Sequence, residues 1–300
     1  MTSFAAAAQV RRALGEKKCG HGGTLDPEAT GVLPVLVGRA TRLSDYFLTF
    51  HKCYEAGLKF GCNTDTGDVW GNVTSLHTEE QDRIASGLTE ADIRRATSDF
   101  IGRISQTPPA YSALKIGGVS AYKLARKGID PGLAAREVNV YDIRVDGFRR
   151  DTLTASISVE CGRGTYIRTL CEDIAGRLGL LGTMASLVRT SYGPLSADDA
   201  VSIDEVKAFG DAAPDRRGER PDFLMPCDSI LTFLDRIDLD EKKADDYVHG
   251  RPVSMIKNGF PVDIGASSDS RDARIYAPGG VFLGVGAVRD SSLKSRISFF

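Results

Sequence analysis

The 300-residue chain has a single tryptophan, only six cysteines and no long hydrophobic run. Its longest apolar stretches, such as residues 32–37, are far shorter than the roughly 20 residues that span a bilayer. The cysteines, at 19, 53, 62, 161, 171 and 227, form no C-x-x-C pair. This spacing argues against a zinc site and a disulfide scaffold, so we expect reduced thiols and no metal.

The chain also lacks the features of a secretory signal peptide. No basic residue precedes the apolar segment 4–8, and Arg11 and Arg12 follow it. We interpret this segment as the start of a helix with Ser3 at its N-cap. We therefore expect a cytoplasmic protein.

An excess of positive charge is missing as well, since the formal net charge is -2. The negative charge is concentrated in residues 198–250, which hold 15 Asp and Glu against 7 Lys and Arg and leave +6 for the rest of the chain. Binding of nucleic acid needs local Lys and Arg rather than a high overall isoelectric point. A basic body able to contact RNA phosphates and a solvated face of mixed charge are both compatible with this distribution.

The length and the periodicity of the chain predict its architecture. Three hundred residues exceed one usual core, so we expect two domains, residues 1–224 and 225–300. Apolar residues alternate with polar ones over 54–60 and 153–161, as in half-buried strands. Helical spacing follows over 167–178, and Gly179 fits a C-terminal cap. The pattern indicates an α+β fold.

Two further segments have recognisable turn chemistry. Residues 211–222 are rich in Pro, Asp and Arg and indicate an exposed loop or linker. Residues 274–284 place Pro-Gly-Gly between two apolar runs and predict a hairpin.

The most informative segment is residues 21–34, with the sequence H-G-G-T-L-D-P-E-A-T-G-V-L-P. Its glycines and prolines exclude regular structure on both sides of Asp26 and predict a constrained loop around a single carboxylate. Taken alone, Asp26 would more often organise a turn than carry out chemistry.

The order of the whole string decides between these interpretations, because it resembles the signature loop of the TruB family of tRNA pseudouridine-55 synthases. Other segments are similar to that family in the same order: G-R-A-T-R at 38–42, K-C-Y at 52–54, Q-T-P-P-A-Y-S-A-L-K at 106–115 and G-T-Y-I-R-T-L at 164–170. Family members usually open with a strand carrying K-P-x-G-x-T-S, whereas this chain opens at Met1-Thr2-Ser3. Either a start codon lies further upstream and the N-terminal strand is truncated here, or this protein dispenses with the strand; we expect the first.

The resemblance implies a fold, an activity and a set of roles. It implies a pseudouridine synthase domain with a mainly antiparallel central sheet flanked by helices, followed by a small β-rich PUA-like domain that contacts tRNA. The enzyme would flip uridine 55 out of the T-arm of tRNA and isomerise it to pseudouridine, with no cofactor, no obligate protein partner and no membrane, as a monomer.

The resemblance also assigns residues to these steps. Asp26 would be the catalytic carboxylate, either as nucleophile at C1′ or as base at C2′, and Arg168 would pair with it and hold it ionised. The remaining matches would line the substrate pocket: the stacking Tyr54, a second tyrosine Tyr166, the apolar Leu187, and His21 filling the space left by the flipped base.

Each assignment has a simpler alternative. Tyr54 and Leu187 could be core residues, Arg168 a surface pair and His21 an ordinary loop histidine. Tyr166 and Arg168 are two positions apart, so they converge on one pocket only if the helix begins irregularly. At the level of the whole protein, the alternatives are a noncatalytic tRNA-binding or tRNA-folding protein and a guide-RNA-dependent pseudouridine synthase relative.

Overall fold

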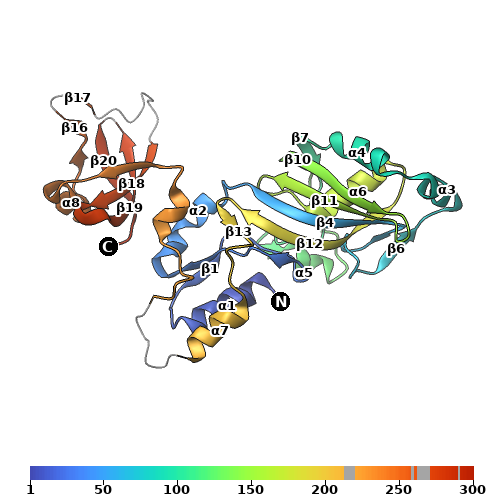
Figure 1. Ribbon diagram of the computed structural model, residues 1–300, viewed down its shortest axis with the longest axis horizontal. Helices are drawn as coiled ribbons and strands as arrows, with labels where there is room; N and C mark the ends of the chain where they lie inside the picture. Colours follow the sequence, from blue (N-terminus) through green and yellow to red (C-terminus); the bar gives the residue numbers. More distant parts are fainter. Residues whose placement is uncertain (213–219, 258–259, 262–270, 290) are drawn as a thin grey trace.

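The computed structural model describes residues 1–300 except 213–219, 258–259, 262–270 and 290 (Figure 1). A large α+β body occupies one end of an elongated molecule, and a small β-rich unit, drawn in orange and red, occupies the other (Figure 1). Part of the predicted loop at 211–222 lies outside the described residues. No helix in the described part of the chain is long and apolar enough to cross a membrane.

The body is built on a seven-stranded sheet with the order β13-β12-β4-β11-β10-β7, to which β2 adds alongside β12. The strands are β2 (Thr30–Gly31), β4 (Lys52–Phe60), β7 (Gly102–Gln106), β10 (Arg136–Arg149), β11 (Thr154–Cys161), β12 (Gly182–Tyr192) and β13 (Leu195–Ser196). All neighbours pair antiparallel except β2 and β12, which are parallel. The α+β class and the two alternating strands predicted from the sequence are confirmed.

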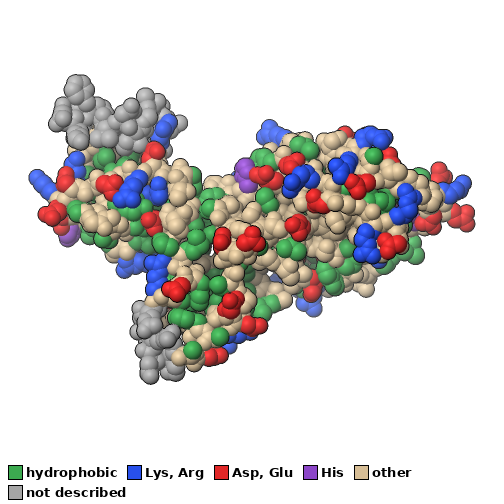
Figure 2. Space-filling view, viewed as in Figure 1, with side chains coloured by type: hydrophobic (Ala, Val, Ile, Leu, Met, Phe, Trp, Pro, Cys, Tyr) green, Lys and Arg blue, Asp and Glu red, His purple; other side chains and the backbone are tan. Residues whose placement is uncertain are grey.

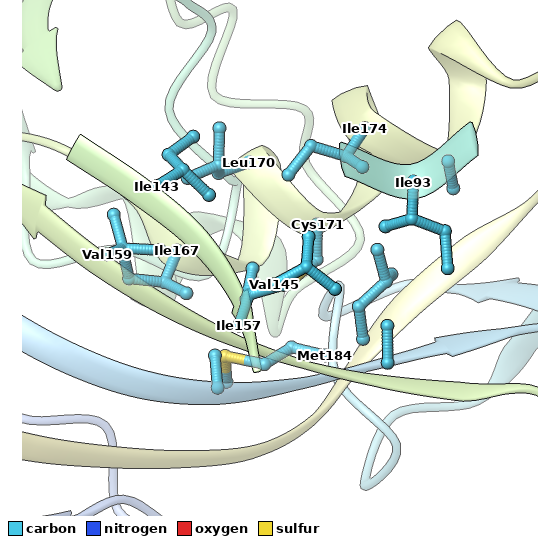
Figure 3. Packing of buried hydrophobic residues seen from close by; sticks show 14 of the residues in the cluster. Ile93, Ile143, Val145, Ile157, Val159, Ile167, Leu170, Cys171, Ile174 and Met184 are labelled. Carbon is cyan, nitrogen blue, oxygen red and sulfur yellow. The ribbon is translucent and has the colours of Figure 1, made fainter. Parts of the chain in front are cut away.

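One face of this sheet is covered by helices and carries the main core. The side chains of Ala56, Leu58 and Phe60 on β4 are buried, whereas Glu55, just before them, and Lys59, between Leu58 and Phe60, are exposed. The covering helices are α3 (Glu79–Gly87), α4 (Glu90–Ser98) and α6 (Ile167–Arg177). Figure 3 shows aliphatic side chains of β10 and β11 meeting those of α6, with α4 closing the side. This packing fixes the N-terminal end of α6 relative to β4 and β12.

The first helix, α1 (Ser3–Ala13), lies beside α7 (Ile203–Asp211) below the sheet (Figure 1). The predicted cap was wrong by one residue, because Thr2 is the N-cap and its hydroxyl accepts from the Ala5 N–H at 3.2 Å. Ser3 instead is buried. Its hydroxyl accepts a hydrogen bond from the Leu25 N–H and donates one to the Leu25 carbonyl. Ser3, which the sequence suggests as a helix cap, therefore anchors the signature loop.

The C-terminal unit is a five-stranded sheet with its own core. Its strands are β14 (Asp235–Asp238), β15 (Val253–Ser254), β18 (Arg271–Ala277), β19 (Val281–Arg289) and β20 (Ser292–Ser298), and α8 (Glu241–Val248) packs on them. The predicted hairpin at 274–284 is confirmed as β18 and β19. Pro278, Gly279 and Gly280 form the turn between them.

A third apolar cluster joins the two parts of the molecule. It contains Val32, Leu36, Leu43, Phe47 and Tyr192 from the body together with Ile230, Leu231 and Val285 from the C-terminal part. Hydrogen bonds border it. The Tyr46 hydroxyl donates to the Asp272 carboxylate, and the Arg42 guanidinium donates to the Ser298 carbonyl. We refer to the eight buried apolar residues, without these polar neighbours, as the bridging cluster.

The remaining elements are short. They comprise β1 (Cys19–His21), β3 (Val35–Val37), α2 (Ser44–Phe47), β5 (Cys62–Thr64), β6 (Val73–Leu76), β8 (Lys115–Ile116), β9 (Val119–Ser120), α5 (Ala121–Ala125), β16 (Ile256–Lys257), β17 (Phe260–Pro261) and the 3-10 turns at 38–43, 227–231 and 278–280. Strands β1 and β3 pair with each other and bracket the signature loop.

Candidate active site

The signature loop is held against the body at its base. Its residues 22–34 leave β1 and return to β3, and the Gly22 N–H donates to the Pro34 carbonyl at 2.9 Å. Asp26 lies near the tip, in a turn that is closed by a hydrogen bond of 3.0 Å from the Ala29 N–H to the Asp26 carbonyl. The turn interpretation and the chemical one are therefore compatible, since the backbone of Asp26 makes the turn and its side chain is left for other contacts.

The Asp26 carboxylate forms a bidentate ion pair with Arg168. Arg168 Nε lies 2.9 Å from Oδ2 and its Nη2 lies 3.1 Å from Oδ1. The arginine side chain is 6% exposed and that of the aspartate 32%, so the guanidinium is enclosed while one side of the carboxylate faces solvent. Arg168 also donates to the carbonyls of Thr66 and Tyr111, at 2.7 and 2.9 Å. These contacts hold the carboxylate in one orientation.

Tyr166 precedes α6 rather than forming part of it. It is the N-cap, with extended backbone, and its N–H and carbonyl both bond to the side-chain amide of the buried Gln106. Because Arg168 lies in the first turn of the helix, the two side chains do not follow helical spacing. Burial raises the pKa of Tyr166, and the Ser112 hydroxyl and the Arg168 guanidinium oppose this.

Tyr54 and Leu187 project from neighbouring strands over the covered face. Tyr54 on β4 pairs directly with Arg189 on β12, and Leu187 pairs with Ala56. Leu187 is 7% exposed, and Tyr54 is half-buried against the main core. Burial raises the pKa of Tyr54 to about 12, with Arg189 acting in the opposite direction. The phenol is therefore neutral at physiological pH.

His21 lies at the end of β1, immediately before the loop, and is half-buried. Burial lowers its pKa, and the nearby Arg189 cation lowers it further, and both effects favour the neutral ring. Within the described residues its Nδ1 is buried without a hydrogen-bond partner.

The six residues singled out from the sequence thus fall into two groups. Asp26, Arg168 and Tyr166 meet at the start of α6, while Tyr54 and His21 share the environment of Arg189, with Leu187 next along β12. Arg189 itself was not predicted, although it belongs to the same L-V-R-T segment as Leu187. A signal was present, because an arginine at a core-facing position of an alternating strand needs an internal partner.

Gly31 cannot be replaced without moving the loop. Its φ is +95°, and a Cβ there would overlap the Arg189 carbonyl. We expect Gly31→Ala to lower the free energy of unfolding by about 3 kcal/mol, through backbone strain and overlap together. Urea denaturation measures this. Gly176→Ala, on an open face of α6, is the control and should leave stability unchanged or slightly raised. Equal stability of the two variants would contradict the prediction.

Comparison of the chain with known proteins finds matching family models and similar curated proteins. Residues 11–167 match the model of the "TruB family pseudouridylate synthase (N terminal domain)", 168–232 that of the "tRNA pseudouridylate synthase B C-terminal domain", and 236–297 that of "Pseudouridine synthase II TruB, C-terminal". Proteins named tRNA pseudouridine synthase B are similar along the chain. One from Dehalococcoides mccartyi is 36% identical over 93% of this chain and 89% of its own length, and one from Clostridium perfringens is 36% identical over 98% of this chain and 93% of its own length.

Solved structures show the same fold at lower identity. The chain aligns over its full length, and over 82% of the other chain, with a protein in a crystal structure of a Cbf5-Nop10-Gar1 complex. The TM-score is 0.68 at 21% identity. A likeness at this identity bears on architecture alone.

Proposed function

The chain belongs to the TruB family of pseudouridine synthases, and from this premise we propose that it isomerises uridine 55 in the T-arm of tRNA to pseudouridine. The observation that supports the proposal most strongly is the Asp26–Arg168 pair, in which an enclosed guanidinium orients a carboxylate that stays open on one side. An acid held only for stability would gain little from that opening. A carboxylate that must reach the sugar of a flipped nucleotide requires it.

The proposed reaction requires few kinds of protein group. The N1–C1′ bond of uridine breaks, the uracil turns, and C5 bonds to C1′. C5 then loses its proton, and N1 takes up a proton, so that the product is an isomer of uridine. The rearrangement is redox-neutral and needs neither an oxidant nor a leaving group from outside. Asp26 starts it, either as nucleophile at C1′ or as base at C2′.

The pocket residues would keep the detached base in place. The ring of Tyr54 is half-buried with its neutral hydroxyl towards Arg189, and we assign it to stacking on the uracil. Leu187 would close the apolar side, Tyr166 would flank the carboxylate, and the neutral His21 at the loop base would occupy the space left in the T-loop.

We further propose that residues 225–300 form the PUA-like domain and contact the tRNA, with the enzyme acting as a monomer in the cytoplasm. Residues 251–300 hold 7 Lys and Arg against 4 Asp and Glu. The face in Figure 2 carries both signs interspersed, so phosphate contacts there would be local rather than spread over one basic surface.

The direct test uses unmodified tRNA transcripts and maps pseudouridine nucleotide by nucleotide. The expected result is one modified position, uridine 55, with no metal or cofactor added. A transcript carrying cytidine at position 55 is the control and should remain unmodified. Binding without modification would favour the tRNA-binding alternative, and modification only with an added guide RNA would favour the guide-dependent one.

Replacing Tyr54 separates its ring from its hydroxyl. We expect Tyr54→Ala to lose most activity, because the stacking face contributes roughly 1 to 3 kcal/mol per base. Tyr54→Phe keeps that face and should bind tRNA nearly normally. Single-turnover rates and tRNA affinity are measured for both. A Phe variant as inactive as Ala, with normal binding, would give the hydroxyl a chemical role. Near-normal rates for both would make Tyr54 a core residue only.

A further inference from the structure

Arg189 is a buried cation without an acidic partner. Its side chain belongs to a residue only 1% exposed, and no carboxylate contacts it in the described part of the chain. The guanidinium donates instead to three backbone carbonyls: Nε to Val32 at 2.7 Å, Nη2 to Gly23 at 3.2 Å and Nη1 to Thr24 at 3.5 Å. Burying an ionised group is costly unless it is fully bonded, so these carbonyls are held firmly.

All three carbonyls belong to the signature loop. Gly23 and Thr24 precede Asp26 by three and two residues, and Val32 lies on the returning arm. The returning arm also meets the Arg189 backbone, whose carbonyl accepts a hydrogen bond from the Val32 N–H at 2.8 Å. A single residue therefore ties both arms of the loop to β12.

The same guanidinium reaches the stacking tyrosine. Arg189 and Tyr54 are directly opposite on β12 and β4, so their side chains are on one face of the sheet and adjacent. The positive charge of the guanidinium favours the ionised form of the Tyr54 hydroxyl and so opposes the rise in its pKa that burial causes. The residue that holds the Asp26 loop is thus also the cross-strand neighbour of Tyr54.

Tyr192 contacts both the Arg189 guanidinium and the base of the signature loop. The Arg189 guanidinium lies 5.0 Å from the centroid of its ring. The Tyr192 hydroxyl is 2.8 Å from the Gly22 carbonyl and 3.0 Å from that of Phe47. The support of the loop therefore continues into the bridging cluster.

We propose that Arg189 is a positioning residue for the reaction, which fixes the loop of the catalytic carboxylate relative to the ring that stacks on the base. This inference rests on the proposed function. The detached uracil must stay against Tyr54 while Asp26 acts on the sugar, so the separation of the two groups has to be fixed. Arg168 orients the carboxylate from α6. Arg189, in contrast, both holds the loop and is the cross-strand neighbour of Tyr54.

The test is Arg189→Lys, which keeps the charge but cannot reach all the acceptors with one nitrogen. We expect its single-turnover rate on tRNA to fall by about a hundredfold, as for a displacement of the order of 1 Å in a catalytic group. The Kd for tRNA should stay within about threefold, since phosphate and stacking contacts are retained. Arg177→Lys is the matched control, because Arg177 is exposed and forms an ion pair with Asp99 at 2.6 Å.

A double-mutant cycle with Tyr54→Phe distinguishes positioning from general support of the fold. If Arg189 acts through Tyr54, Arg189→Lys should reduce the rate clearly less in the Tyr54→Phe background than in the wild type. Full additivity, or a folded Arg189→Lys variant with wild-type rate, would overturn the inference. A wild-type protein that does not modify tRNA would instead overturn the proposed function.

The contact can be tested even if Arg189→Lys does not fold. In protein labelled with ¹⁵N-arginine, Tyr54→Phe removes the hydroxyl but leaves Arg189 in place. We expect the signal of one buried, slowly exchanging guanidinium to shift in that variant, and exchange of the 22–32 amides to remain slow. Guanidinium signals identical to those of the wild type would overturn the inference.

Discussion

An Asp26→Asn variant should form no detectable pseudouridine while binding tRNA within about tenfold of the wild type, a difference of at most ~1.4 kcal/mol. The amide has nearly the size of the carboxylate and keeps one oxygen for Arg168, so the loop should stay in place. It is, however, neither a nucleophile nor a base of comparable strength. Affinity comes mainly from phosphate and stacking contacts that do not involve Asp26.

Asp99→Asn is the matched control for this substitution. Asp99 forms an ion pair with Arg177 in which both side chains are about half exposed, and such pairs contribute little to stability. Its turnover should equal that of the wild type. Rapid turnover by Asp26→Asn, measured on the same transcripts, would remove Asp26 from the reaction.

A chain ending at Leu224 should be much less stable and much less active than the full chain. It keeps all the residues proposed for the pocket but removes Ile230, Leu231 and Val285 from the bridging cluster. Each buried aliphatic side chain contributes about 1.5 to 3 kcal/mol, so the loss should lower the Tm of the body by about 10 °C or more. Phe47 and Tyr192, which brace the signature loop, would become exposed.

Two point variants separate this effect from the loss of RNA contacts. Leu231 and Leu293 are both fully buried, but Leu231 belongs to the bridging cluster and Leu293 to the core of the C-terminal unit. Each Leu→Ala change should cost about 2 to 5 kcal/mol of stability. Only Leu231→Ala should also reduce single-turnover rates at saturating tRNA. Equal rates for both variants, together with a fully active truncated chain, would show that the cluster does not support the loop.

The local patterns of the sequence predicted strands at 54–60 and 153–161, a helix from 167 and a hairpin at 274–284, and the structure has β4, β11, α6 and the β18–β19 pair there. Alternation and helical spacing are properties of neighbouring residues, so they can be read directly. The start of α1 was placed one residue late, because Thr2 and Ser3 are both good caps and only the contact with Leu25 distinguishes them.

The site was only partly accessible to the same reasoning. The motifs indicated Asp26 and Arg168, which the structure places together although they are 142 residues apart. Arg189 was missed because its role depends on the register of β12 with β4, and register is not readable from one sequence. The bridging cluster was missed for a similar reason, since its members come from both sides of the predicted boundary at 224.

The strand order also constrains how the protein is made. Strand β4 lies between β11 and β12, which follow it by about a hundred residues or more, and β2 pairs with β12. During synthesis the segment carrying Asp26 therefore leaves the ribosome long before β12, whose Arg189 holds both arms of the loop. The active site should be among the last parts of the body to form, with β4 exposed in nascent chains until residue 192 has emerged. Because of this strand order, we expect nascent chains of this protein to depend on chaperones until β12 has emerged.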